Sequence, residues 1–351
     1  MKRFVIAWAL ALVAALLVAA CVGGQFDPQS KVDSVRLFAS RADKPYARPG
    51  EIVNIDVLAT DARKDKTRPL KILWVPFICM NPRDDLYYLC FAPPEVRGDG
   101  GAILPTFDAG TSDASVNIPT DGTLFRPGID LSDLLPSGPR FSFTMPLDAI
   151  QPRRTTKTPY GLAIAFAIAC AGRVETVERD EEGGPQQVPI ACFDENNQKL
   201  PPSDYVLGIT RVYAYDTRVN NNPVIDGATF DGKPVDPAVG ISVDRCTAAK
   251  KEDCPKLKLN VSVPATSWEI QEEAFDADGN PLREQIWVTY YASTGQMGSD
   301  ARLLYDTTGG AIEGSDVEYQ ASQVYEDGHI WAVVHDNRGG AEWVDFPVHV
   351  K

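Results

Sequence analysis

Apolar and polar residues alternate with a period of two along much of this chain, and long amphipathic helical patterns are nearly absent. In Leu257–Val263 every odd-numbered residue is apolar and every even-numbered residue is polar, and similar alternation recurs at 53–57 and 344–350. Strands of this kind bury one face and expose the other, as in antiparallel sandwiches. The pattern therefore predicts an all-β protein.

The predicted strands fall into two sets. The first set is expected at 32–40, 51–59, 70–79, 141–145, 160–170 and 205–216. The second set is expected at 224–230, 256–263, 285–292, 301–306, 316–322, 329–335 and 342–350. A polar segment, 218–222, is followed by Pro223 and is typical of a linker. We therefore expect two domains, 32–217 and 223–351.

The first domain carries a strand with unlike faces and two long insertions. In Gly161–Cys170, bulky apolar residues alternate with alanines, which predicts a central strand with one bulky face and one closely covered small face. The run is too short to span a membrane. Residues 91–140, rich in Gly and Pro, and 171–204 are expected as insertions; loops of such length are often functional, although a plain surface elaboration fits equally well.

The chain begins with the features of an export signal. Met1–Arg3 is basic, Phe4–Ala20 is apolar, and small residues precede Cys21. Two alternatives stay open. An uncleaved anchor is one, because the 19 apolar residues Phe4–Val22 could cross about 30 Å of hydrocarbon. A plain secretory signal with a leftover cysteine is the other.

The segment Val18–Cys21 resembles the lipobox of bacterial lipoproteins. That resemblance implies a signal peptide at 1–20, a lipid on the Cys21 thiol that anchors the protein to a membrane, and a tether at 21–31. Val22 follows the cysteine where lipoproteins retained at the inner membrane have Asp. The expected location is therefore the cell envelope, at the outer membrane.

The formal net charge of −14 argues against nucleic-acid binding, which needs clustered Lys and Arg. Loss of residues 1–20 would leave 32 basic and 48 acidic residues, a net charge of −16. Residues 223–351 hold 10 basic and 22 acidic residues, so −12 of this charge belongs to the second domain.

Six cysteines remain after Cys21, an even number that favours disulfides in an exported protein. They are Cys79, Cys90, Cys170, Cys192, Cys246 and Cys254. Fifteen connectivities are possible, and we favour the pairing of neighbours because each such pair lies within one predicted hairpin or loop. A zinc site is disfavoured because no C-x-x-C motif occurs and no histidine lies within about 70 residues of these cysteines.

Each strand set has an aromatic residue on its third strand, Trp74 or Trp287, and resembles an immunoglobulin-like β-sandwich. The segment Trp331–Trp343 is similar to the final hairpin of PKD-type and cadherin-type domains. In such a topology the third and sixth strands are antiparallel, which would place Cys79 and Cys170 at opposite ends of the sandwich. The resemblance therefore also favours Cys79–Cys90 and Cys170–Cys192 over a cross-linked pair.

Candidate catalytic chemistry is sparse. The sequence contains no G-x-S-x-G, H-E-x-x-H, G-x-G-x-x-G or P-loop motif. His329 and His335 would lie about 20 Å apart on one strand, too far to share a metal ion, and we expect both of them and His349 at the surface. Glycoside hydrolysis needs a pair of carboxylates and stays an open alternative, although no spacing in the sequence singles out such a pair. We therefore expect a non-catalytic protein.

A calcium site is suggested by resemblance to cadherin repeats. The linker 220–223 together with 274–280 is similar to their calcium-binding linker and D-A-D motif, which implies Asn220, Asn222, Asp276 and Asp278 as ligands. In a sandwich of this type Asn280 and Asp336 would lie at the same end, and calcium binds six to eight such oxygens. The alternative is that Asp278-Gly279 is a turn and the acids keep the surface soluble.

Aromatic residues are the other candidate binding feature. Trp287, Thr289 and Tyr291 share one face of a predicted strand; the opposite face carries Ile286, Val288 and Tyr290, and we expect Trp287 in the core. A second row, Tyr205, Tyr213 and Tyr215, is ambiguous, and exposed rings of either row could stack on a glycan.

We expect a lipid-anchored envelope protein with a binding, adhesion or structural role. The alternative is a carbohydrate-binding module or accessory subunit of an envelope hydrolase.

Overall fold

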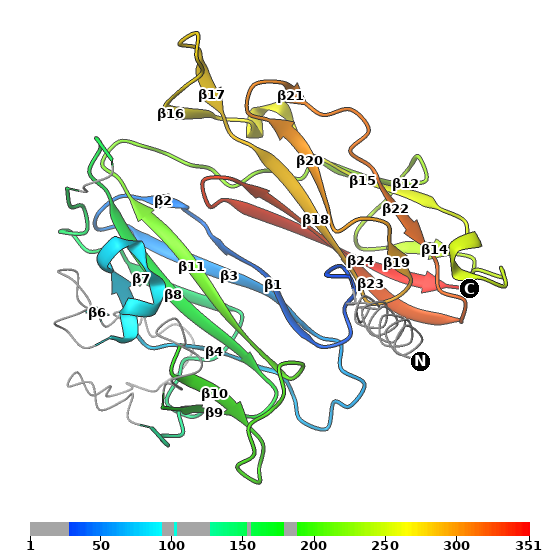
Figure 1. Ribbon diagram of the computed structural model, residues 1–351, viewed down its shortest axis with the longest axis horizontal. Helices are drawn as coiled ribbons and strands as arrows, with labels where there is room; N and C mark the ends of the chain where they lie inside the picture. Colours follow the sequence, from blue (N-terminus) through cyan, green and yellow to red (C-terminus); the bar gives the residue numbers. More distant parts are fainter. Residues whose placement is uncertain (1–27, 93–101, 104–126, 153–155, 179–187) are drawn as a thin grey trace, which may run out of the picture.

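The structure, a computed structural model, describes residues 28–92, 102–103, 127–152, 156–178 and 188–351. Two β-sandwiches lie side by side, one built from residues 35–214 and the other from residues 227–350 (Figure 1). The predicted fold class is confirmed. Each strand of the two predicted sets overlaps an observed strand, and the segment predicted at 70–79 is divided into two.

The first sandwich has a small sheet and a large sheet. The small sheet has the order β1-β3-β7, with β1 (Val35–Ala42), β3 (Ile52–Asp61) and β7 (Arg140–Thr144). The large sheet has the order β2-β11-β8-β5-β6, with β2 (Tyr46–Ala47), β11 (Tyr205–Ala214), β8 (Gly161–Cys170), β5 (Ile78–Met80), β6 (Ala102–Ile103) and, also paired with β8, β4 (Lys71–Trp74). Beside them lie the hairpin of β9 (Arg173–Thr176) and β10 (Ile190–Phe193) and the 3-10 helices η1 (Arg83–Asp85) and η2 (Tyr87–Phe91).

The second sandwich repeats this plan. One sheet has the order β13-β12-β15-β22-β19, with β13 (Lys233–Pro234), β12 (Gly227–Phe230), β15 (Leu257–Ser262), β22 (Val317–Gln320) and β19 (Gln296–Met297). The other has the order β14-β24-β23-β18-β20-β21, with β14 (Ile241–Val243), β24 (Ala341–Val350), β23 (Glu326–Asp336), β18 (Ile286–Ala292), β20 (Ala301–Asp306) and β21 (Gly310–Ala311). The hairpin of β16 (Ile270–Phe275) and β17 (Pro281–Arg283) and the 3-10 helices η4 (Lys251–Asp253) and η5 (Ala265–Ser267) complete it.

Both sandwiches have an immunoglobulin-like strand order. The long last strand pairs antiparallel with the long strand before it, β11 with β8 and β24 with β23. On its other side it pairs in parallel with a short early strand, β2 or β14. Because the same arrangement occurs twice, the chain is a tandem of immunoglobulin-like sandwiches.

The two faces of β8 divide the interior of the first sandwich, as the sequence predicts. Ala163, Ala165 and Ala167 face the small sheet and pack in one core cluster with Trp74. The bulky face, including Phe166, packs in another cluster that also contains side chains from both insertions. These are Leu131 and Leu135 from 91–140, and Val174, Val188, Ile190 and Leu200 from 171–204. The described parts of the insertions therefore cover an apolar sheet face.

The three disulfides join sequence neighbours: Cys79–Cys90, Cys170–Cys192 and Cys246–Cys254. Cys79 lies opposite Ile164 on β8, whereas Cys170 ends that strand six residues later. The two cysteines are thus separated along the sheet, as the predicted topology requires.

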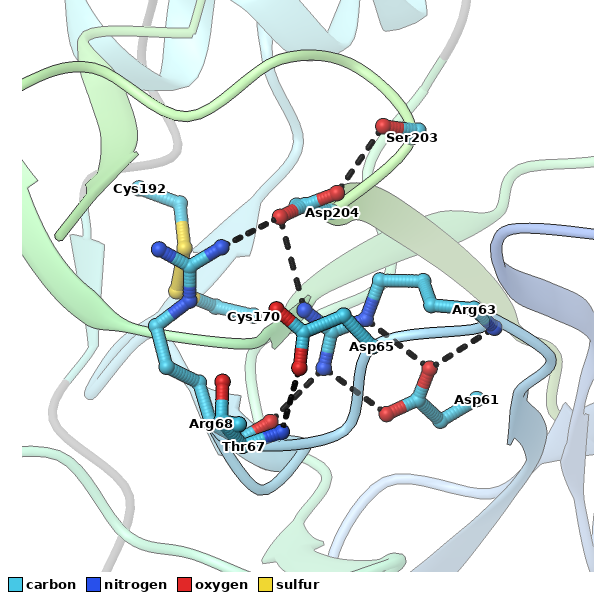
Figure 2. A network of polar contacts seen from close by, with 9 residues as sticks. All are labelled: Asp61, Arg63, Asp65, Thr67, Arg68, Cys170, Cys192, Ser203 and Asp204. Carbon is cyan, nitrogen blue, oxygen red and sulfur yellow. Dashed lines mark hydrogen bonds and ion pairs between the residues drawn. A yellow bond between two sulfur atoms is a disulfide. The ribbon is translucent and has the colours of Figure 1, made fainter.

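A polar clamp lies beside Cys170–Cys192 (Figure 2). The buried Arg63 side chain donates to Asp61 at 2.8 and 2.9 Å and to Asp204 at 3.4 Å, and Asp204 also accepts from Arg68 at 2.8 Å. Burial raises the pKa of Asp61, but the hydrogen bonds from Arg63 outweigh it and leave this pKa below its usual value. The clamp joins the segment after β3 to the segment before β11. Its charges are paired within the protein, which indicates a structural role.

The sandwiches meet through an apolar surface on the outside of the β18-β23-β24 sheet. Ile286, Val288 and Tyr290 form the core face, so the prediction that Trp287 lies in the core is wrong. The opposite face contributes Tyr291 and Trp331, whose rings lie 4.6 and 4.8 Å from Phe38 of β1. We call this contact the aromatic interface; Val32, Ala39, Val333, Leu58, Ala62 and Trp343 also belong to it.

Polar contacts surround the aromatic interface. Arg41 of β1 pairs with Glu342 of β24 and lies 4.3 Å from the ring of Trp343. In the linker, Asn222 donates to the carbonyl of Ala42 at 2.8 Å and accepts from the amide of Ala341 at 3.0 Å. One linker side chain therefore bridges both sandwiches.

We predict that Phe38→Ala uncouples the two sandwiches. Phe38 is 8% exposed, and truncating a buried Phe costs about 3–5 kcal/mol. Scanning calorimetry should show one thermal transition in the wild type and two in the variant. Phe275→Ala, at a ring that is 61% exposed, is the matched control and should keep a single transition. A single transition at the wild-type temperature in Phe38→Ala would contradict a stabilising aromatic interface.

Candidate binding cleft

A cleft of about 470 Å³ lies at the junction of the two sandwiches. The first sandwich supplies residues from β1, β2 and β11 and from the segment before β8; the second supplies the turn between β23 and β24. The lining residues are Ser40, Tyr46, Thr156, Tyr160, Ile209, Thr210, Arg211, Tyr213, Tyr215, Asn337, Arg338 and Gly339. This volume lies in the range typical of small-ligand pockets.

Four tyrosines form a connected aromatic cluster at this cleft, in which Tyr46 and Tyr213 are half-buried and Tyr160 and Tyr215 are buried. Tyr213 of β11 and Tyr215, the residue that directly follows this strand, have ring planes 22° apart and centroids 6.5 Å apart. Tyr46 of β2 lies 5.9 and 4.8 Å from them, and Tyr160 lies 5.7 and 6.0 Å from them. Strand alternation and the parallel β2–β11 pairing therefore bring together rings that are far apart in the sequence.

The phenol groups of the cleft stay protonated at neutral pH. Burial raises the pKa of Tyr46, Tyr213 and Tyr215 above the ordinary tyrosine value. The Tyr160 hydroxyl donates to Asp85, and Thr210 donates to Ser40 at 2.7 Å. The cleft therefore presents neutral hydroxyls beside aromatic faces.

Arg338 is held at the cleft by two acids of the second sandwich. It donates to Glu284 at 2.6 Å and to Glu269 at 2.7 Å, and its guanidinium lies 5.5 Å from the Tyr46 ring. Asn221 of the linker donates to Glu269 at 2.6 Å. We call Glu269, Glu284, Asp336 and Arg338 the junction network.

Two acids of the junction network, Glu284 and Asp336, are buried, whereas Glu269 is half-buried. Glu284 is fully buried, and burial, reinforced by the nearby Asp336, raises its pKa to about 7 although Arg338 opposes the shift. Burial also raises the pKa of Asp336, which accepts from the amides of Arg338 and Gly340 and from Asn220. A Cβ at position 340 would lie 2.1 Å from Asp336 Oδ2, so this turn requires glycine.

The six residues predicted as calcium ligands do not form one coordination sphere. Asn220 binds Asp336, while Asn222 bridges Ala42 and Ala341. The Asp276 carboxylate instead accepts hydrogen bonds from the backbone amides of Asp278 and Asn280 and from the Asn280 side chain. These residues form the exposed turn of the β16–β17 hairpin, which projects from the body (Figure 1). In the described parts of the chain, no group of three or more His, Cys, Asp or Glu side chains could hold a metal ion. The Arg338 guanidinium occupies the end of the sandwich where the resemblance places calcium.

The histidines differ from expectation at one position. His329 and His349 are exposed and pair with Asp345 and Asp327. His335 instead stacks on Trp287 at 5.3 Å, and burial lowers its pKa to about 4. His335 is therefore half-buried and not freely exposed as expected, because the Trp287 ring of the neighbouring strand β18 covers one of its faces.

The N-terminal segment lies mostly outside the described residues, and Cys21 with it. Residues 28–31, expected as part of the tether, lie against the second sandwich. Val32 donates to the carbonyl of Ala292 at 2.9 Å, and Ala292 donates to that of Ser30 at 2.7 Å. No helix in the part of the chain that the structure describes is long and apolar enough to cross a membrane.

Sequence reasoning identified part of the cleft. Tyr213 and Tyr215 belong to the predicted tyrosine row, but Tyr205 is at the opposite end of β11, paired with Cys170. Tyr46, Tyr160 and Arg338 come from other elements and carried no local signal. Only the parallel pairing of an early strand with the last one could have indicated them.

Comparison with known proteins gives no family. No family model and no curated protein matches the chain. Fibronectin(III)-like modules of Clostridium thermocellum CbhA align over 90% of this chain and 94% of theirs, at 10% identity and a TM-score of 0.21. Tandem Ig repeats of Dlar align over 91% and 99%, at 10% identity and a TM-score of 0.22. Latent PorU from Porphyromonas gingivalis aligns over 91% of this chain and 24% of its own, at 12% identity and 0.20. With TM-scores this low, the fold assignment rests on strand order alone.

We predict that Arg338→Met destabilises the protein more at pH 8 than at pH 5. Removing one partner of a buried pair costs about 3–5 kcal/mol because the other charge stays buried. Without Arg338 the pKa of Glu284 in the folded state rises further above the value of about 4.5 that it has in the unfolded state. Above that pH the folded state binds more protons than the unfolded state, so the free energy of unfolding falls as pH rises. Urea unfolding at both pH values measures this.

Two further variants make that result interpretable. Adding Glu284→Gln to Arg338→Met should recover most of the loss at pH 8. Arg140→Met removes an arginine that is 83% exposed and should cost less than about 1 kcal/mol. Equal losses at both pH values would contradict the role assigned to Glu284.

Proposed function

We propose that this chain is a lipid-anchored, non-catalytic protein of the cell envelope that binds its target with two sandwiches acting as one rigid unit. The observation that carries the proposal is the aromatic interface, which buries the outer sheet face of one sandwich against β1 of the other. It fixes the two walls of the junction cleft, so that ligand groups meet a preformed surface.

A second candidate function is carbohydrate binding, alone or as an accessory to an envelope hydrolase. The half-buried rings of Tyr46 and Tyr213 favour it, since aromatic faces pack well against apolar faces of sugar rings and phenol hydroxyls can form hydrogen bonds. Both functions use the same cleft and neither requires a reaction.

The anchor would orient the body. The segment 30–32 binds at Ala292, the last residue of β18. The Asn337–Gly339 turn of the cleft lies at the opposite end of this strand, because it follows Asp336, which pairs with the first residue of β18. These ends are about 20 Å apart along the strand. A lipid on Cys21, which six residues separate from Pro28, would hold the Ala292 end at the membrane and leave the cleft facing away from it.

We predict that Cys21→Ser abolishes membrane attachment. The wild type should incorporate labelled palmitate and fractionate with the outer membrane, and the variant should do neither. Val22→Asp, which keeps the lipidated thiol, is the control: it should keep the label and move to the inner membrane. A Cys21→Ser protein that still carries the label would rule out lipidation at this residue.

We predict that the two ends of the second sandwich lie at different depths. Lys251→Cys, near the bound segment 28–31, and Asn337→Cys, at the cleft, would each carry a fluorophore on the lipidated chain in vesicles. Spin-labelled headgroups should quench the dye at position 251 more strongly, because position 337 faces away from the bilayer. Equal quenching, with palmitate still incorporated, would refute the orientation and leave the anchor standing.

A further inference from the structure

We propose that the junction cleft binds an acidic saccharide, with tyrosine rings against the faces of the sugar and Arg211 against its carboxylate. This inference rests on the proposed binding function and names the class of its ligand.

The hydroxyl content of the cleft favours a saccharide over a peptide. Seven lining residues carry a hydroxyl group, and Ile209 is the only aliphatic one among the described residues. A proline-rich or aliphatic peptide needs apolar pockets for its side chains. A pyranose needs a flat aromatic surface and many hydrogen-bonding partners. Tyr46 and Tyr213, both half-buried with ring centroids 5.9 Å apart, provide the exposed ring surface, and the buried ring of Tyr215 packs against Tyr46 at 4.8 Å.

The charge of the cleft favours an acid. Its lining contains Arg211 and Arg338 and, among the residues that the structure describes, no Asp or Glu, although the chain has a net charge of −14. Glu269 and Glu284 already neutralise Arg338. Arg211 is exposed on β11, on the same face as Ile209 and Tyr213, and forms no ion pair with a described residue. A guanidinium can bind a carboxylate through two parallel hydrogen bonds.

Asn337 adds a polar group from the second sandwich. Its side-chain oxygen accepts from the amide of Gln285 at 3.1 Å, which fixes the orientation of the side chain and leaves its NH2 group as a donor. A saccharide bound to both Asn337 and Arg211 would contact both sandwiches at once. The site therefore depends on the aromatic interface that sets their relative position.

We predict that the full chain in detergent micelles binds acidic oligosaccharides more tightly than their methyl esters. Trigalacturonate and alginate trisaccharides, each compared with its ester by calorimetry, are the probes. The acid should bind at least tenfold more tightly at low salt. Arg211→Gln should remove that preference and leave ester binding unchanged, whereas Tyr213→Ala should weaken both forms at least tenfold and Tyr213→Phe only slightly. Arg140→Gln, at an exposed arginine of β7, should change nothing.

Different negative results would overturn different parts of the proposal. Equal affinity for acid and ester would overturn the acidic class while leaving carbohydrate binding in place. Failure of every probe to bind at millimolar concentration would overturn the saccharide class, as would a proline-rich peptide that binds and is lost in Tyr213→Ala. None of these results touches the lipid anchor, which palmitate labelling tests independently.

Discussion

The arrangement of this molecule depends on one buried surface, the apolar outer face of the β18-β23-β24 sheet. In an isolated sandwich that face would expose Tyr291, Trp331 and Val333 to water, at a cost proportional to their apolar area. Phe38 on β1 covers it, and this contact sets the angle between the sandwiches. Once that angle is fixed, the turn after β23 must lie beside the tyrosines of β11. The cleft is therefore a consequence of how the aromatic interface is buried.

In the first sandwich, the strand β8 is likewise covered on both of its faces. All ten residues of β8 are buried, because the alanine face lies close to the small sheet while the bulky face is covered by side chains of the two insertions. Insertions that looked like candidate functional loops thus form part of a second core in their described parts. Cys79–Cys90 and Cys170–Cys192 fasten covering segments, and the Arg63 clamp lies beside the second of these disulfides (Figure 2). The proposed binding cleft lies instead beside β11.

Period-two alternation predicted most of the long strands, since one-sided burial leaves a strong local signal. The strand β8, buried on both faces, was predicted from its alternation of bulky residues and alanines, and β16 was not predicted. Alternation could not decide which face of β18 is the core, because both faces are apolar when one packs inside and the other against a second sandwich. That ambiguity explains the errors at Trp287 and His335. The junction network was equally hidden: Glu269, Glu284 and Arg338 meet only after folding, and no local spacing marks them. The residues that the resemblance to cadherin repeats implies as calcium ligands are likewise engaged in separate hydrogen bonds, with Asn220 on Asp336 and Asp276 within its own hairpin.

A guanidinium at the junction has different consequences from a metal ion. Calcium would make the junction depend on solution conditions outside the protein, whereas Arg338 is covalently part of the chain and joins Glu269 and Glu284 at every calcium concentration. The pair does not need to be strongly stabilising, because the desolvation of Glu284 offsets much of the Coulombic attraction. Its geometric effect is more important: the fork of donors and the contact with Tyr46 hold the β23–β24 turn at one position. A binding surface shared by two domains requires this kind of fixed junction, since each unfixed degree of freedom would reduce affinity.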